Sequence, residues 1–234
     1  MNALSALACL AALTLPCAAA AQAITSPAQP AETAAFDIVR TDVRSEGADV
    51  VFTVQVRGEA GEVKPKAVGQ FAGSAVFSYV WPTSLDSASV GFESDQGILA
   101  LAVTFHPDFD DAAYGGVNRH VWHPHWVVLV PDEACGPGAL KVRDIPAGTT
   151  PRVPATWPNV PLLIDSPEYP TQLGGDLVTV RVPAGVIGAP EGVRFDGVTS
   201  ALLVNANLHA PLLCISDVFD VASGDLSLPG RITP

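Results

Sequence analysis

Short segments in which hydrophobic and polar residues alternate recur along the chain and predict β-strands. The clearest is segment 49–57, in which Phe52 and three valines share one face. Segment 178–182 repeats the alternation, and segment 98–105 is apolar on both faces, as is typical of a strand covered on both sides. We expect further strands at 36–43, 75–80, 122–130, 162–164, 200–208 and 215–221.

Helical patterns are nearly absent from the sequence. Proline or glycine interrupts each window of about a dozen residues that could otherwise carry helical spacing. Many short strands separated by turn residues predict an all-β protein, either an antiparallel β-sandwich or a barrel-like jelly roll. The chain has 234 residues, and strands resume promptly after its Pro-rich segments 146–161 and 183–190, so we expect a single domain over residues 35–234.

The N-terminal residues 1–23 are typical of a signal peptide. An uncharged apolar run over residues 3–15 is shorter than the roughly 20 residues that span a bilayer, and residues 21–23 (Ala-Gln-Ala) fit a small-x-small cleavage site. No later apolar run is long enough to cross a membrane. We therefore expect a protein exported to the periplasm or secreted, with no transmembrane segment after cleavage and a flexible leader over residues 24–34.

Cleavage of the signal peptide would remove two of the four cysteines and leave Cys135 and Cys214. In an oxidising compartment such a remaining pair usually forms a disulfide, which would here close a loop of about 80 residues. The alternatives are two buried thiols or a thiolate metal site, but neither cysteine has the CxxC neighbour that structural zinc sites generally use. The sequence therefore predicts a domain with one disulfide.

The charge balance argues against one class of partner. The chain carries 12 basic and 24 acidic residues, which gives a net charge of −12. A surface that binds nucleic acid needs the opposite sign. We therefore expect no nucleic-acid partner.

The residue types that most suggest chemistry lie between positions 105 and 126. Four of the five histidines fall there, and two of them, His123 and His125, form a His-x-His pair at the start of a predicted strand. On an extended backbone these two side chains point the same way, about 6.6 Å apart along the chain. His106 follows the preceding predicted strand, so pairing of the two strands would bring it beside the His-x-His pair.

Three neutral imidazoles together with a carboxylate suit a divalent transition metal. Asp108, Asp110 or Asp111 could supply the carboxylate or orient an imidazole, and His120 could replace one of the other histidines. The mature chain would have no Met and its cysteines would be oxidised, which argues against Cu(I). Zn(II) or Cu(II) is the expected metal, and Fe(II) and Ca(II) are the alternatives. The predicted ligands are His106, Asp108, His120, His123 and His125.

Three functions compete for this segment. The first is an exported protein that binds one metal ion. The second is a metal-dependent enzyme, a hydrolase, a hydratase or a non-haem iron type, in which Asp110 or Asp111 is the general base beside a metal-bound water. The third is a carbohydrate- or partner-binding module without catalysis, which uses Trp122 and Trp126 as stacking platforms and the histidines only as structural groups.

A second, weaker group of polar residues lies on the strand predicted over 200–208. Alternation places Asn205, Asn207 and His209 on one face, where they could bind a small molecule or simply face solvent. The sequence has no G-x-S-x-G elbow, phosphate-binding glycine loop or H-E-x-x-H motif. The sequence alone leaves open whether the protein is an enzyme.

Overall fold

The computed structural model describes residues 22–30, 33–111, 113–188, 190–204 and 213–232. Most of the expected signal peptide, together with Asn205, Asn207 and His209, lies outside these ranges. The structure is 42% strand and 8% helix, with antiparallel sheets and one disulfide. The predicted all-β fold class is therefore confirmed.

One group of antiparallel strands closes into a barrel. Its members are β4 (Ala75–Pro82), β5 (Ile98–Phe105), β6 (His123–Pro131), β7 (Leu140–Val142), β12 (Val198–Val204) and β13 (Leu213–Val221). Around the ring the order is β5, β4, β12, β13, β7 and β6, and the pairing of β5 with β6 closes it. The short strand β8 (Ile164–Asp165) extends the wall beside β6.

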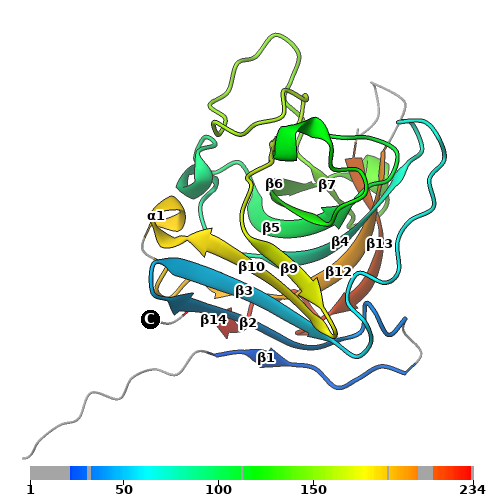
Figure 1. The fold of residues 1–234 in the computed structure, drawn as a ribbon. Coiled ribbons are helices and arrows are strands. Elements are labelled where there is room, and N and C mark those ends of the chain that lie inside the picture. Colours follow the sequence, from blue (N-terminus) through cyan, green and yellow to red (C-terminus); the bar gives the residue numbers. More distant parts are fainter. Residues whose placement is uncertain (1–21, 31–32, 112, 189, 205–212, 233–234) are drawn as a thin grey trace, which may run out of the picture.

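A five-stranded antiparallel sheet lies against one wall of this barrel (Figure 1). It consists of β1 (Ile24–Thr25), β2 (Ile38–Glu46), β3 (Asp49–Val56), β10 (Leu177–Pro183) and β9 (Thr171–Gly174), in that order. The first strand falls within the segment expected to be a flexible leader: Ile24 is buried and pairs with Thr41 of β2. The fold of the described residues therefore begins before position 35.

The remaining elements are short. They are the paired strands β11 (Arg194–Phe195) and β14 (Gly230–Arg231), the helix α1 (Ala184–Ile187), and the 3-10 turns η1 (Ser87–Val90), η2 (Ala113–Gly116) and η3 (Glu133–Cys135). The long alternating segments of the sequence form strands near their expected positions, and segment 98–105 is β5 itself. Alternation does not reveal β1, β7, β9, β11 or β14, because strands of two to four residues offer too few positions to show it.

The space between the barrel wall and the five-stranded sheet is filled by large rings, and we call it the aromatic core. Tyr79 and Trp81 point into it from β4 and Trp126 from β6, and all three are fully buried. Phe52 of β3 meets both indoles edge-on, with ring centroids 5.8 Å and 6.1 Å away. Burial of these rings stabilises the contact between the two layers.

The opposite face of the same barrel strands lines the inside of the barrel, which we call the lumen. Along β5, Ala102 and Thr104 face the lumen, whereas Leu101 and Val103 join the aromatic core. Small and branched side chains from the other strands complete the lining and leave a pocket of about 1140 Å³. Segment 98–105 is apolar on both faces because each face borders a different hydrophobic region.

The predicted disulfide is present in the barrel wall. Cys135, at the end of η3, is bonded to Cys214 of β13, with Cα atoms 5.6 Å apart. The neighbouring strand β7 is three residues long, and a single residue pair, Lys141 with Cys214, joins it to β13. The disulfide therefore reinforces the barrel where its backbone pairing is thinnest.

Candidate metal centre

Pairing of β5 with β6 brings three histidines to one end of the barrel. The register places Thr104 opposite His123 and Ala102 opposite His125, so both imidazoles of β6 lie on the lumen side. His106 continues the chain just beyond β5, and its Nε2 atom is 3.1 Å from Nε2 of His123. The expected meeting of His106 with the His-x-His pair is thus confirmed.

Each imidazole is held by its Nδ1 atom on a backbone carbonyl. A carbonyl oxygen only accepts hydrogen bonds, so Nδ1 carries a proton in each ring, and in the neutral form of the ring Nε2 then has a free lone pair. The Nδ1–oxygen distances are 2.8 Å for His106 on Phe109, 2.8 Å for His123 on Val121 and 3.1 Å for His125 on Asp165.

Asp111 faces the three Nε2 atoms with one of its two carboxylate oxygens. Its Oδ2 atom lies 3.0 Å from Nε2 of His123, 3.3 Å from that of His125 and 3.7 Å from that of His106. The other oxygen, Oδ1, accepts a hydrogen bond from the side-chain amide of Asn118. One oxygen is thus held by the surrounding loop, while the other is directed at the histidines.

The loop between β5 and β6 positions Asp111 through Asn118. The Asn118 amide also donates to the Ala113 carbonyl at 3.0 Å, and its side-chain oxygen accepts the Asp111 backbone N–H at 3.1 Å. Gly115 and Gly116 both have a positive φ, which lets the chain turn back within this short span. Sequence reasoning misses Asn118, because no local pattern connects it with Asp111.

The cluster formed by His106, Asp111, His123 and His125 is compact and largely dry. Its four ligand atoms lie within 4.8 Å of one another, and the three histidines are at most 3% exposed. Burial lowers the pKa of His125 to about 3, so this imidazole is neutral and has a lone pair to offer. The hydrogen bond that Asp111 accepts from the Asn118 side chain favours the ionised form of its carboxylate. A neutral imidazole beside an ionised carboxylate could hold a metal ion.

Two of the predicted ligands lie outside the cluster. His120 is exposed in the turn before β6. Asp108 accepts hydrogen bonds from the backbone amides of Val68 and Gly69, at 2.8 Å and 2.7 Å, and so anchors a different loop. These contacts correct the predicted ligand set: the chain leaves the strand direction after His106, which turns Asp108 away and brings Asp111 in.

Asp110, one of the two candidate general bases, is engaged in an ion pair. Hydrogen bonds from the Arg119 side chain and backbone lower the pKa of Asp110 well below its ordinary value, and the backbone amide of Asn118 adds a further one. A carboxylate stabilised in this way is a weak base. Asp111, the other candidate, lies among the histidines instead.

Trp126 cannot be a stacking platform for a ligand, which corrects another expectation. Its ring is fully buried in the aromatic core, and Nε1 donates to the Tyr169 hydroxyl at 3.2 Å. Trp122 is partly buried against Tyr79 and Phe105, with ring centroids 5.2 Å and 5.5 Å away. The pair therefore offers no exposed surface of two aromatic faces to a sugar.

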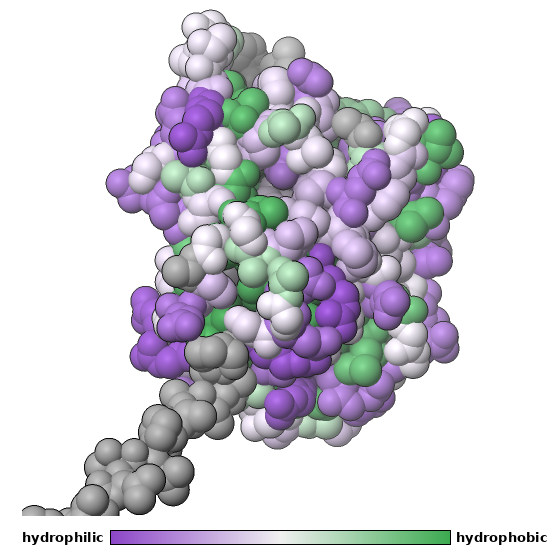
Figure 2. Space-filling model, turned by 60° about the vertical axis from the view of Figure 1, so that its left-hand side comes forward, coloured by the Kyte–Doolittle hydropathy of each residue, from purple (hydrophilic) through white to green (hydrophobic). Residues whose placement is uncertain are grey.

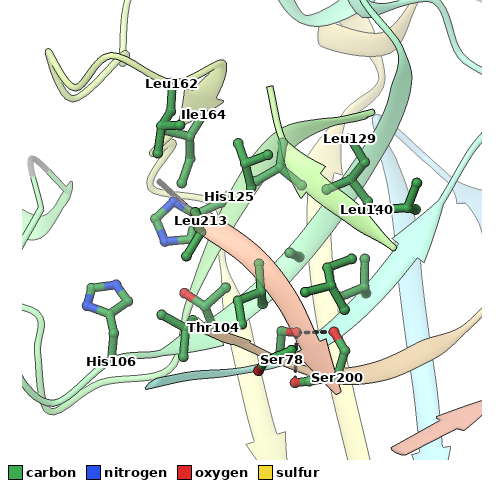
Figure 3. Close-up of a pocket in the computed structure, with 18 of the residues that line it drawn as sticks. Ser78, Thr104, His106, His125, Leu129, Leu140, Leu162, Ile164, Ser200 and Leu213 are labelled. Carbon is green, nitrogen blue, oxygen red and sulfur yellow. Dashed lines mark hydrogen bonds between the residues drawn. The ribbon is translucent and has the colours of Figure 1, made fainter. Parts of the chain in front are cut away.

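The cluster borders the lumen. His106, His125 and Asp111 are among the residues that line the pocket inside the barrel. In Figure 3 the two imidazoles lie at one end of the pocket near Thr104, and apolar side chains such as Leu129 occupy the other end. A molecule inside the barrel would therefore meet the histidine cluster at one end.

Comparison of the chain with protein families, with curated protein sequences and with solved structures finds no match. Within the described residues, no helix is both long and apolar enough to cross a membrane. The function therefore has to follow from the chemistry of the cluster and of the pocket.

Proposed function

We propose that the protein binds one divalent transition-metal ion through Nε2 of His106, His123 and His125 and Oδ2 of Asp111. The observation that carries the proposal is the common orientation of the three imidazoles. Each Nδ1–H donates to a backbone carbonyl, and each Nε2 lone pair faces the same carboxylate oxygen. Carbonyl partners of this kind fix the tautomer and ring orientation of metal-binding histidines.

A cation would remove the repulsion between the lone pairs of these side chains. Nε2 of His106 and Nε2 of His123 are 3.1 Å apart, and neither has a hydrogen to share when Nδ1 is protonated. Oδ2 of ionised Asp111 is likewise only an acceptor. Lone pairs that face one another in a dry site repel, whereas a divalent cation between them attracts all of them. The Ser166 hydroxyl donates a long hydrogen bond to the same oxygen, at 3.4 Å, and its other contact in the cluster is with Nδ1 of His125, not with an Nε2 atom.

The donor set favours Zn(II) or Cu(II). Imidazole and carboxylate together suit both ions, and Fe(II) as well. Ca(II) is disfavoured, because it takes oxygen ligands and this cluster offers mainly nitrogen. The bonded pair Cys135–Cys214 supplies no thiolate that would favour Cu(I).

Metal uptake tests the proposal directly. The chelator-treated protein is dialysed against Zn(II) or Cu(II), and bound metal is counted by inductively coupled plasma mass spectrometry. We expect about one equivalent in the unmodified protein and at least a tenfold loss of affinity in His123→Ala/His125→Ala. The matched control is His120→Ala, which removes an exposed histidine of the same segment and should retain the metal. Equal uptake by the double variant would overturn the assignment.

A metal-dependent enzyme is the second candidate, and the opening of the cluster onto the pocket favours it. His106 and His125 both line that pocket, so a substrate could approach the metal from inside the barrel. Replacement of the metal by Co(II) distinguishes the two candidates. A catalytic site keeps a position for an exogenous ligand, so added azide should shift the visible Co(II) spectrum. A spectrum unchanged by azide would indicate a closed binding site.

We also propose that the protein is exported. The apolar segment 1–23 supports export, and so does the disulfide, because such bonds persist in oxidising compartments. N-terminal sequencing of the protein from a periplasmic or medium fraction should show a chain that begins at Ile24. Recovery of the uncleaved chain only from the cytoplasm would contradict this proposal.

A further inference from the structure

The lumen is larger than the barrel itself requires. Interiors of small barrels are normally filled by side chains, whereas here a pocket of about 1140 Å³ remains among valine, leucine and alanine side chains. Pockets that bind small molecules usually measure roughly 300–1,000 Å³ and are mostly apolar. The lumen therefore has the size and lining of a site for a small apolar molecule.

The pocket extends to the surface along apolar side chains. Phe71 and Leu226 both line it, and they are 50% and 43% exposed. The Phe71 ring contacts Phe109, and the Phe109 ring stacks on the imidazole of His106 with centroids 4.2 Å apart. Unlike the mostly apolar pocket lining, the molecular face drawn in Figure 2 carries hydrophobic residues interspersed with hydrophilic ones. The lining therefore includes apolar side chains that reach the surface, and Phe71 and Phe109 connect them to the end of the pocket that holds the histidines.

One polar atom in the lumen lacks a hydrogen-bond partner. Thr104 is 6% exposed, and its Oγ1 is one of two buried side-chain polar atoms without a partner among the described residues. Ser78 and Ser200, the other hydroxyl groups in the view of Figure 3, bond to each other at 2.8 Å. A buried hydroxyl left unpaired is costly, so Thr104 is suited to a polar atom brought in by a ligand.

The charges around the pocket specify the kind of polar atom. Among the described residues, no lysine or arginine lines the pocket, whereas Asp110, Asp111 and Asp217 do. In the metal-free protein, the imidazoles of His106 and His125 are the only basic groups among these lining residues, and both already face Asp111. A ligand with a carboxylate or phosphate group would therefore meet like charge. A neutral oxygen, which can exchange a hydrogen bond with a hydroxyl, fits these surroundings.

We propose that the lumen binds a neutral, elongated apolar molecule with one hydroxyl or carbonyl oxygen, such as a long-chain alcohol or ketone. The apolar body lies along the barrel interior, and the oxygen bonds to Oγ1 of Thr104 beside the histidine cluster. This inference goes beyond the proposed metal binding and is made for the metal-free protein, in which the pocket and the Thr104 hydroxyl are present without a cation that would attract a charged head group.

Displacement of a fluorescent probe measures this binding. The probe is N-phenyl-1-naphthylamine, and the competitors are 1-decanol, 2-decanone and decanoate, which share a chain length and differ in the head group. For the chelator-treated, metal-free protein we expect saturable binding of one probe per chain, displacement by the alcohol and the ketone, and at least tenfold weaker displacement by decanoate. Tighter binding of decanoate than of 1-decanol would overturn the inferred ligand class.

Two variants locate the ligand. Thr104→Val keeps the side-chain shape and removes the hydroxyl, so 1-decanol should bind about fivefold to tenfold more weakly while the probe binds unchanged. Val80→Trp/Val127→Trp fills the lumen and should abolish probe binding, whereas Leu177→Trp, which alters an exposed residue of β10, should not. Equal affinity for 1-decanol in Thr104→Val would overturn the head-group contact. Probe binding that survives both tryptophans in a folded protein would place the ligand outside the lumen. Metal content, measured on the same samples, reports separately on the proposed metal centre.

Discussion

Strands β4, β5 and β6 contribute one face to the aromatic core and the other to the lumen. In the aromatic core large rings fill the space, and their polar atoms are paired: Trp81 donates to Thr41 at 3.1 Å and Tyr79 to the Ala35 carbonyl at 2.9 Å. In the lumen the side chains are smaller, a pocket remains, and the Thr104 hydroxyl has no partner within the part of the chain that the structure describes. The two regions therefore differ in role: the first stabilises the fold, and the second contains the pocket for which we propose a ligand.

Shortening a leucine in each region gives the largest expected contrast. Leu101→Ala removes a fully buried side chain from the aromatic core and should lower the free energy of unfolding by about 3–5 kcal/mol. Leu129→Ala faces the pocket, where fewer atoms surround the side chain, so we expect a loss of only about 1–2 kcal/mol. Urea unfolding of the two variants measures the difference. Equal losses would show that the lumen is as tightly packed as the aromatic core.

The disulfide should matter most to the lumen side, because it reinforces the wall between β7 and β13. Cys135→Ser/Cys214→Ser is expected to lower the free energy of unfolding by about 2–4 kcal/mol, since the bond closes a long loop of the unfolded chain. Thermal unfolding of oxidised, reduced and serine forms checks this value. A reduced protein as stable as the oxidised one would show that backbone pairing suffices to close the barrel.

Enlarging two adjacent valines tests the empty space itself. Val128 points into the aromatic core and Val127 into the pocket. Val128→Phe should cost about 1–3 kcal/mol through overpacking, whereas Val127→Phe should cost less than about 1 kcal/mol because the lumen accommodates the ring. Chemical denaturation of both variants provides the comparison. A larger loss for Val127→Phe would contradict the presence of the pocket.

The pH dependence of the free energy of unfolding tests the burial of the Tyr79 phenol in the aromatic core. Burial raises the pKa of Tyr79 to about 12 from 10.0, so above pH 10 the unfolded chain loses this proton while the folded protein keeps it. Below pH 10 the phenol is protonated in both states, and its contribution to the free energy of unfolding is fully present. Between pH 10 and pH 12 deprotonation of the unfolded chain lowers that free energy. From pH 9 to pH 11 the unmodified protein should lose about 1.4 kcal/mol more than Tyr79→Phe does. Urea unfolding at the two pH values measures the difference. Equal losses of unfolding free energy in the unmodified protein and in Tyr79→Phe would rule out this role for the Tyr79 phenol.

Hydrophobic patterning predicts the fold class well but not the closure of the barrel. Alternation along 49–57 and 178–182 marks β3 and β10, because each strand has one buried face and one partly exposed face. The apolar run 98–105 indicates a doubly covered strand. It does not show that one of the covering regions is hollow, since periodicity reports burial and not the volume left unfilled.

The sequence predicts the three histidines of the site but not which aspartate joins them. His123 and His125 share a face by strand geometry alone, and His106 joins them once neighbouring strands pair. Choosing among the aspartates depends on the loop, where hydrogen bonds made by Asn118 direct Asp111 inward. Such contacts join residues that no spacing rule connects, so Asp108 looks equally suitable in the sequence.

A crystal structure of the Zn(II)- or Cu(II)-loaded protein, with anomalous diffraction collected at the absorption edge of the metal, would locate the bound ion. We expect one strong anomalous peak among Nε2 of His106, His123 and His125 and Oδ2 of Asp111, with metal–nitrogen distances of about 2.0–2.1 Å. A peak at exposed His120 instead, or an ordered cluster with no peak between these four atoms, would contradict the proposed metal centre.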